Sequence, residues 1–148
     1  MVTLLDVNVL IALAWPNHVH HRAAHRWFDR NRHLGWATSP ATQSGFVRVS
    51  SNGRVMPDAR SPREAIDLLR RILALPDHVF WNDDVSIATS DLVDETKLVG
   101  HRQVADAHLV AVALRHGGRL GTLDRGIRNI VPPSHSVEQA VCFVLSDA

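Results

Sequence analysis

The chain has 148 residues, of which 45% are apolar and 21% charged, and its net charge is +1 when the histidines are neutral. This length suits one domain with its own core, and the composition excludes both a largely disordered chain and a membrane protein. The charge balance also lacks the bulk basicity of many nucleic-acid binders, so the distribution of charge matters more than its total. We expect a single domain over residues 1–148.

The N-terminal segment predicts a strand, a turn and a helix around one aspartate. Val2–Leu5 is short, apolar and β-favouring, and Asp6 follows it directly. A helix-like stretch then covers Asn8–Ala14. The apolar run 9–15 is too short to span a bilayer, which takes about 20 residues, and it lacks the basic leader of a signal peptide. We therefore expect a cytoplasmic protein.

The following residues predict a helix, a strand and another helix. A Trp-Pro-Asn sequence ends the first helix, and the second is expected over residues 18–30. A strand is expected at 36–39. Its last residue, Ser39, precedes a proline. A serine cap followed by proline favours the start of a helix, and this helix would carry Gln43 and Arg48.

The rest of the chain continues the alternation of helices and strands. Ser61 and Glu64 form a capping box, which predicts a helix running to Ala74. A Gly-Gly pair at 117–118 is typical of a left-handed helix end. The remaining expected elements are a strand at 78–81, a short helix within 86–96, a helix at 104–116, and strands at 120–123 and 141–145. Cys142, inside the last strand, is expected to be buried.

Short strands that alternate with helices predict a parallel sheet covered by helices on both faces, a three-layer α/β fold. In such folds ligands gather at the carboxyl ends of the strands. The sequence contains no Gly-rich phosphate-binding loop, which argues against an enzyme driven by nucleotide hydrolysis.

Three aspartates are expected at that edge of the sheet. Asp6 ends the first strand, Asp124 ends the fourth, and Asp106 lies in the first turn of the helix between them. Each aspartate alone could simply cap a helix. Carboxylates that converge repel one another, so the three together indicate a bound cation. Oxygen ligands without histidine or thiolate point to Mg²⁺ or Mn²⁺.

Four blocks of the sequence resemble the VapC-type ribonucleases of the PIN-domain family. They read LLDVNVLIAL, HVHHRAAHRWF, TSPATQSGFVRVSSN and VADAHLVAVALRHGGRLGTLDRGI, and they cover most of the chain in the expected order. The resemblance implies a PIN-like fold and endonucleolytic cleavage of RNA with Mg²⁺ or Mn²⁺. It also implies a homodimer and neutralisation by a small VapB-type antitoxin.

The resemblance assigns roles to individual residues. The catalytic, metal-binding aspartates of the family fall on Asp6, Asp106 and Asp124. Two family positions that form hydrogen bonds around the metal fall on Asn8 and Thr122. We expect Asp6 and Asp106 to be the principal ligands, with Asp124 holding a water or a weaker second ion. Water activated by the metal would then hydrolyse the phosphodiester bond.

Gln43 departs from the family pattern, which usually has an acidic residue there. A glutamine can offer a carbonyl oxygen near the metal, but it brings no charge and cannot act as a base. An alternative is therefore a non-catalytic or attenuated PIN protein that binds RNA or its antitoxin. A phosphatase of the haloacid dehalogenase kind also begins with an aspartate after a first strand, but it needs a second aspartate where this chain has Asn8.

Two further groups of residues invite a functional interpretation. His18, His20, His21 and His25 could suggest zinc, but a zinc site needs three or four ligands and no further ligand is evident, which favours a solvated polar face. Arg22, Arg26 and Arg30 form a stripe that could contact RNA phosphates together with Arg48, although a stripe is also typical of any surface helix. The four tryptophans suggest core positions, and a surplus of aromatic residues at the surface would favour a dimer.

Overall fold

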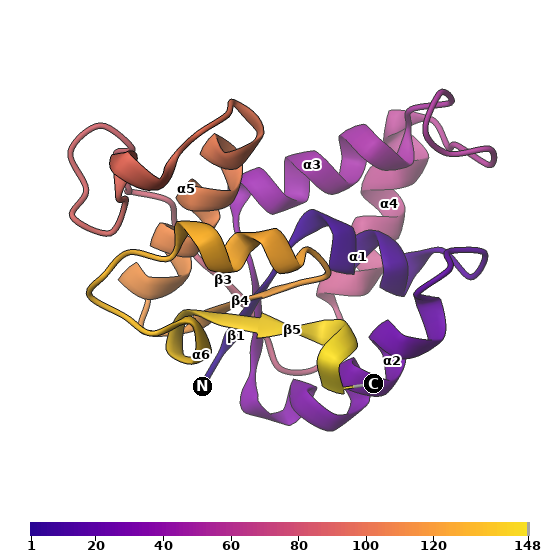
Figure 1. Cartoon of the computed structure of the whole chain (residues 1–148). Helices are drawn as coiled ribbons and strands as arrows, with labels where there is room; N and C mark the ends of the chain where they lie inside the picture. Colours follow the sequence, from indigo (N-terminus) through magenta and orange to yellow (C-terminus); the bar gives the residue numbers. More distant parts are fainter. Residues whose placement is uncertain (148) are drawn as a thin grey trace.

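A five-stranded parallel sheet forms the centre of the molecule (Figure 1). The computed structural model describes residues 1–147, and the strands lie in the order β3-β2-β1-β4-β5. Their bounds are β1 Thr3–Leu5, β2 Trp36–Thr38, β3 His78–Phe80, β4 Arg119–Thr122 and β5 Val141–Phe143. The order places β1 between β2 and β4, so the first strand lies at the middle of the sheet.

Six α-helices connect the strands. They are α1 Val7–Ala14, α2 His21–Asn31, α3 Pro40–Ser50, α4 Pro62–Leu73, α5 Arg102–Arg115 and α6 Val137–Ala140. Short 3-10 turns cover Arg32–Leu34, Glu95–Lys97, Arg125–Ile130 and Val144–Asp147. No helix within residues 1–147 is long and apolar enough to cross a membrane.

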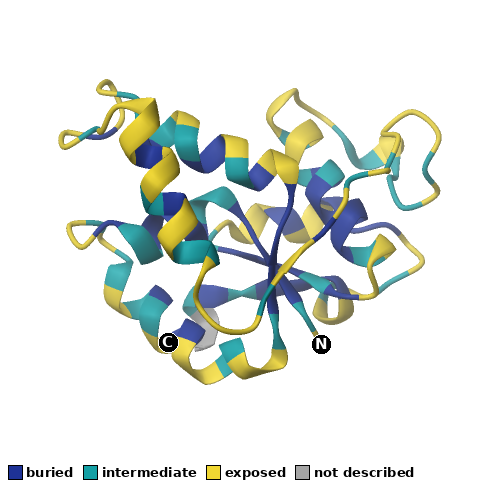
Figure 2. Cartoon of the chain, turned by 180° about the vertical axis from the view of Figure 1, so that it is seen from behind, coloured by how far each residue is buried: buried dark blue, intermediate teal, exposed yellow. Residues whose placement is uncertain are grey.

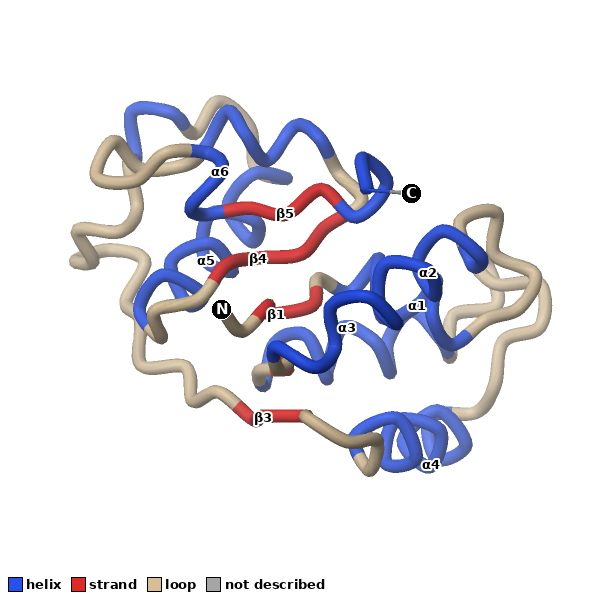
Figure 3. Tube along the Cα trace, turned by 90° about the horizontal axis from the view of Figure 1, so that it is seen from below, coloured by secondary structure: helices blue, strands red, loops and turns tan. Residues whose placement is uncertain are grey.

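The helices form one layer on each face of the sheet (Figure 3). Helices α1 to α4 lie on one side, and α5 and α6 lie on the other. Because neighbouring residues of a strand point to opposite faces, Leu4 and Leu5 of β1 belong to two different hydrophobic clusters. Strands β1 and β2 and most of β4 and β5 are buried, whereas the edge strand β3, the outer faces of the helices and the loops are exposed (Figure 2). The predicted three-layer α/β fold is confirmed.

Several local predictions are also confirmed. Ser61 and Glu64 form the capping box, with Glu64 N–H donating to Ser61 Oγ at 3.1 Å and Ser61 N–H donating to Glu64 Oε1 at 3.2 Å. Gly117 has a φ of +72°, the left-handed conformation that ends α5. Cys142 is buried, and its sulfur accepts a hydrogen bond from Trp27 Nε1 at 3.2 Å.

Four predictions differ from the structure by more than one residue. Helix α2 begins at His21 because His18 N–H and His21 N–H bond to carbonyls of a preceding turn. Within 86–96 the helical structure is limited to the 3-10 turn that starts at Glu95. The last strand ends at Phe143, where the chain enters a 3-10 turn.

The fourth difference changes how Asp106 is understood. Helix α5 begins at Arg102, because Gln103 Oε1 accepts the N–H groups of Val99 and Gly100 at 2.6 and 3.1 Å and so stabilises an earlier helix start. The first turn of α5 contains no acidic residue. The prediction that placed Asp106 in the first turn is therefore wrong, and helix capping does not explain this aspartate.

The tryptophans belong to the core. Trp15, Trp27, Trp36 and Trp81 are all at most 7% exposed. The sequence-based argument for a dimer from a surplus of surface aromatic residues therefore fails, and the expectation of a dimer rests on the family resemblance alone.

Candidate active site

Asp6 lies at the carboxyl end of the central strand and caps the first turn of α1. Its Oδ1 accepts the N–H of Val7 at 2.8 Å, and its Oδ2 accepts the hydroxyl of Thr122 at 2.8 Å. Only 7% of the residue is exposed. Burial raises the pKa of Asp6 above its ordinary value, and these two hydrogen bonds oppose the rise without cancelling it. The side chain is thus fixed in position while its negative charge remains poorly solvated.

Thr122, the last residue of β4, connects the polar groups around Asp6. Its hydroxyl donates to Asp6 and accepts from the N–H of Asp124 at 3.1 Å and from Asn8 Nδ2 at 3.4 Å. Asn8 Oδ1 in turn accepts the N–H of Leu123 at 3.2 Å. These bonds tie the end of β4 to the start of α1, so the ends of two adjacent strands hold one site.

Asp106 extends this site from α5. Its carboxylate accepts no hydrogen bond from any residue between 1 and 147, and the residue is half-buried. Burial, followed by the charges of Asp6 and then Asp124, raises the pKa of Asp106 to about 6. Asp124 is exposed, and its Oδ1 accepts the N–H of Gly126 at 2.8 Å. Mutual repulsion of this kind is relieved when a cation binds.

The three aspartates line one open cleft of about 490 Å³ together with Asn8. Within the described residues, no three His, Cys, Asp or Glu side chains are arranged closely enough to hold a metal ion by themselves. Mg²⁺ commonly takes one or two carboxylates and completes its coordination with waters and substrate phosphates. The oxygen-only donor set and the unpartnered carboxylate of Asp106 therefore fit a divalent cation of this type.

Gln43 does not line the carboxylate cleft. Its Nε2 donates to the hydroxyl of Thr38 at 3.0 Å, and that hydroxyl also contacts His78 Nε2 at 2.8 Å. This geometry gives no support to the predicted contact between the Gln43 carbonyl oxygen and a metal. Arg48, the other predicted substrate residue, is exposed on α3 beside Val49, which does line the cleft.

His18 lines the cleft, although the sequence had suggested only a solvated surface for it. No local signal in the sequence places it there, because His18 lies in the turn between α1 and α2. His21 and His25 do not line the cleft and instead contact the backbone of α1. Their ring nitrogens lie 2.8 Å from the carbonyl oxygens of Ala12 and Leu13, so they bind the last turn of α1.

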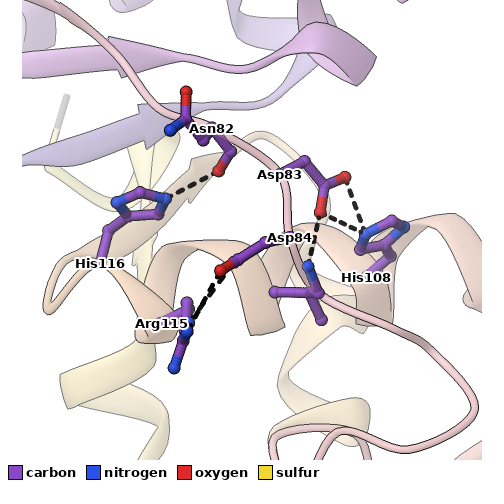
Figure 4. Close-up of polar contacts among 7 residues, drawn as sticks. Asn82, Asp83, Asp84, His108, Arg115 and His116 are labelled. Atoms are coloured by element: carbon purple, nitrogen blue, oxygen red, sulfur yellow. Dashed lines mark hydrogen bonds and ion pairs between the residues drawn. The ribbon is translucent and has the colours of Figure 1, made fainter.

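The helix that carries Asp106 is held by the segment after β3 (Figure 4). His108 Nε2 lies 2.9 Å from a carboxylate oxygen of Asp83, and the Arg115 guanidinium donates to Asp84 at 3.1 Å. His116 Nε2 lies 2.8 Å from the carbonyl oxygen of Asn82. These contacts, from His108 to the C-terminal end of α5, fix where Asp106 stands relative to the sheet.

Comparison with known proteins identifies relatives over most of the chain. The PIN domain family model matches residues 3–131. The chain is 50% identical over 127 residues to ribonuclease VapC39 of Mycobacterium tuberculosis H37Rv, covering 86% of this chain and 91% of that protein. It is 48% identical over 126 residues to ribonuclease VapC38 of the same strain, covering 85% and 87%.

A solved structure shares the fold. The crystal structure of VapBC2 from Rickettsia felis, bound to a DNA fragment from its promoter, contains a chain that superposes with a TM-score of 0.59. The match covers 89% of this chain and 97% of that chain, at 12% sequence identity. At this identity the likeness supports the fold only.

Proposed function

This chain belongs to the PIN-domain family and to its VapC ribonucleases, and we infer from that membership that it is a metal-dependent endoribonuclease, the toxin of a toxin–antitoxin pair. The observation that carries this proposal is the convergence of Asp6, Asp106 and Asp124 on one cleft at the carboxyl ends of β1 and β4. The substrate that we propose is RNA, and the proposed cation is Mg²⁺, for which Mn²⁺ can substitute.

The chain's residues divide the work of phosphodiester hydrolysis. A bound divalent cation supplies an acidified water and offsets negative charge on the phosphate. Asp6 and Asp106 would hold that cation, Asp6 in an orientation fixed by Thr122 and Val7. Asp124, which is exposed at the rim, would orient water on the outer side.

The proposal also covers partners and organisation. Neutralisation by a VapB-type antitoxin and assembly as a homodimer follow from the resemblance to VapC proteins. We propose that the protein acts in the cytoplasm and that residues 1–148 form one PIN domain.

The test is cleavage of purified total RNA with Mg²⁺ and with EDTA, for the wild type and for Asp6→Asn. We expect cleavage only with the metal, and a loss of about a hundred- to a thousandfold in Asp6→Asn, comparable to other losses of a key electrostatic group. Asp29→Asn, an exposed aspartate of α2, is the matched control and should cut normally. Equal cleavage by folded Asp6→Asn and the wild type would contradict the metal assignment.

A second candidate is a PIN protein that binds RNA or antitoxin without cutting. Gln43 favours it, because the family usually has an acid at this position. Absence of cleavage by the wild type with either Mg²⁺ or Mn²⁺, combined with measurable RNA binding, would establish this alternative.

A further inference from the structure

The cleft that contains the aspartates has a second, mostly apolar half. Its lining comes from α1, from the end of α3, from the loop that follows α3 and from the turn before α2. The residues are Val7, Ile11, His18, Val49, Val55 and Met56. We call these six residues the apolar wall. The metal-site proposal uses none of their side chains, and only the backbone N–H of Val7 takes part in it, as a donor to Asp6.

The loop part of the apolar wall is held in place before any ligand arrives. The N–H groups of Val55 and Met56 donate to the carbonyl oxygen of Asn52 at 3.1 and 2.9 Å, and Asn52 Oδ1 accepts the N–H of Arg54 at 3.0 Å. This turn leaves Val55 60% exposed while Met56 is buried beneath it. An apolar surface that is already ordered costs little entropy when a ligand covers it.

His18 gives the apolar wall a defined polar group. Its Nδ1 accepts the backbone N–H of His20 at 3.0 Å. Burial, followed by the nearby His20 and His21, lowers the pKa of His18 and so favours the neutral ring. With Nδ1 occupied as an acceptor, the ring proton lies on Nε2, which bonds to no residue within 1–147. The ring therefore offers one hydrogen-bond donor.

Positive charge flanks the apolar wall. Arg48 precedes Val49, and Arg54 precedes Val55. Both arginines are exposed, and neither forms an ion pair with a residue in the described part of the chain. A ligand that suits this surface combines negative charge, a flat apolar face and a hydrogen-bond acceptor. A nucleotide of a single strand has all three features.

We propose that the apolar wall is a subsite for one unpaired nucleobase of an RNA strand, which packs on Val55 and Met56 and accepts a hydrogen bond from His18 Nε2. The inference rests on the proposed ribonuclease function, and it places the base beside the phosphate that reaches the aspartates. The whole cleft has a volume of about 490 Å³. Sites for small ligands usually have volumes of roughly 300 to 1,000 Å³, so the cleft is large enough for one nucleotide.

The direct test measures binding without cleavage. Fluorescence anisotropy in EDTA gives the Kd of homopolymeric oligoribonucleotides of A, C and U, and of an abasic ribose-phosphate oligomer of equal length. We expect the wild type to bind its preferred base-containing oligomer about tenfold more tightly than the abasic oligomer, because one base covers apolar surface of Val55 and Met56. The abasic oligomer should still bind through its phosphates.

Two substitutions separate the parts of the subsite. Val55→Ser removes apolar surface at an exposed position, and Val19→Ser is its control, because Val19 is 86% exposed but outside the cleft. His18→Asn keeps an acceptor near Nδ1 and loses the Nε2 donor, whereas His18→Gln places an amide donor near Nε2. We expect Val55→Ser and His18→Asn each to weaken base-dependent binding by about three- to tenfold, and His18→Gln to weaken it less.

The outcomes distinguish this inference from the proposed function. If the wild type binds base-containing and abasic oligomers equally, or if Val55→Ser and Val19→Ser behave alike, the subsite is disproved, whether or not the enzyme cuts RNA. An apolar wall used only by a protein partner would give this result. If base-dependent binding is lost in the variants but no RNA is cut with Mg²⁺ or Mn²⁺, the subsite stands and the proposed catalysis fails.

Discussion

Asp106 is the aspartate of the site whose pKa is raised by burial and by the negative charges of both other aspartates. It has neither a hydrogen-bond donor nor a cationic partner within the described chain, and two other aspartates share its cleft. A carboxylate in this position is unfavourable in the isolated protein and becomes favourable once a cation is present. In the proposed metal site, some stability of the metal-free protein would thus be exchanged for affinity toward the ion.

This exchange predicts a pH dependence of stability. The pKa of Asp106 rises from 3.8 to about 6 in the folded protein, so the folded state binds its proton more tightly than the unfolded state. The resulting stabilisation is complete below pH 3.8 and is lost as the pH rises through about 6. Thermal unfolding in EDTA should show this loss, and Asp106→Asn should reduce it. The same pH dependence in wild type and Asp106→Asn would contradict the assignment.

Cation binding should depend on pH in the opposite sense, because the ion requires the ionised carboxylate. Calorimetric titration of Mn²⁺ should show weaker binding below about pH 6 than above it. Asp29→Asn, which changes an exposed aspartate outside the cleft, should preserve both pH profiles.

Gln43 gives a prediction that follows from its hydrogen bonds. In Gln43→Glu the Thr38 hydroxyl can donate to the new carboxylate and accept from His78, so the contacts persist with their direction reversed. We expect the Mn²⁺ affinity to change by less than about threefold. A tenfold change would correspond to about 1.36 kcal/mol in binding free energy, so the expected effect is small. The pKa of His78, which burial lowers in the wild type, should rise toward its ordinary value. Calorimetry and NMR titration measure the two effects, and much tighter Mn²⁺ binding would show that the side chain turns into the cleft.

At the scale of secondary-structure elements, the close approach of α1 and α3 positions the start of α1. A Cβ added at Gly45 of α3 would lie 2.5 Å from Cγ2 of Val7, the residue next to Asp6. A valine methyl near the backbone cannot move away freely. The absence of a side chain at Gly45 therefore lets the two helices meet beside Asp6, where the candidate site begins.

Gly45→Ala should consequently destabilise the protein. Alanine improves helix propensity by about 1 kcal/mol. Overpacking costs about 1 to 3 kcal/mol, which leaves a net loss of about 1 kcal/mol in the free energy of unfolding. Urea denaturation measures this loss, and Gly53→Ala is the control because nothing lies within 4 Å of its added Cβ. A Gly45→Ala protein as stable as the wild type would show that the helices separate without cost.

The secondary-structure elements show which parts of the fold the sequence predicts and which it does not. The order of strands and helices, the capping box at Ser61 and the glycine end of α5 follow from local patterns, and these predictions are confirmed. The start of α5 was missed because it depends on the Gln103 side chain binding two amides of the preceding loop. The edge strand β3 is short, and its Val79 and Phe80 are exposed, so periodicity alone could not describe its surroundings.

For the site, sequence spacing places Asp6 and Asp124 at strand ends, and the structure brings both to one cleft with Asp106. The apolar wall could not be predicted in the same way. His18 and Val55 come from a turn and a loop, and their meeting depends on how these segments fold back over α1, which no local pattern specifies.

At the scale of the whole molecule, the family resemblance predicts that two copies associate. Multi-angle light scattering at micromolar concentration should report twice the chain mass of 16.4 kDa. A mass of one chain would contradict the expectation, and comparison with the protein mixed with its antitoxin would then show whether the partner drives assembly.

The contact between Thr122 and Asp6 joins residues 116 positions apart. Strand β1 likewise gains β4 as its neighbour only after residues 119–122 have been made. The N-terminus of a chain is synthesised first and leaves the ribosome first. A partly translated copy can therefore contain Asp6 but lack Thr122, whose hydroxyl orients it. Assembly of the candidate site thus waits until the residues of β4 have been made. A copy that ends before residue 122 therefore holds no assembled candidate site beside the ribosome's own RNA.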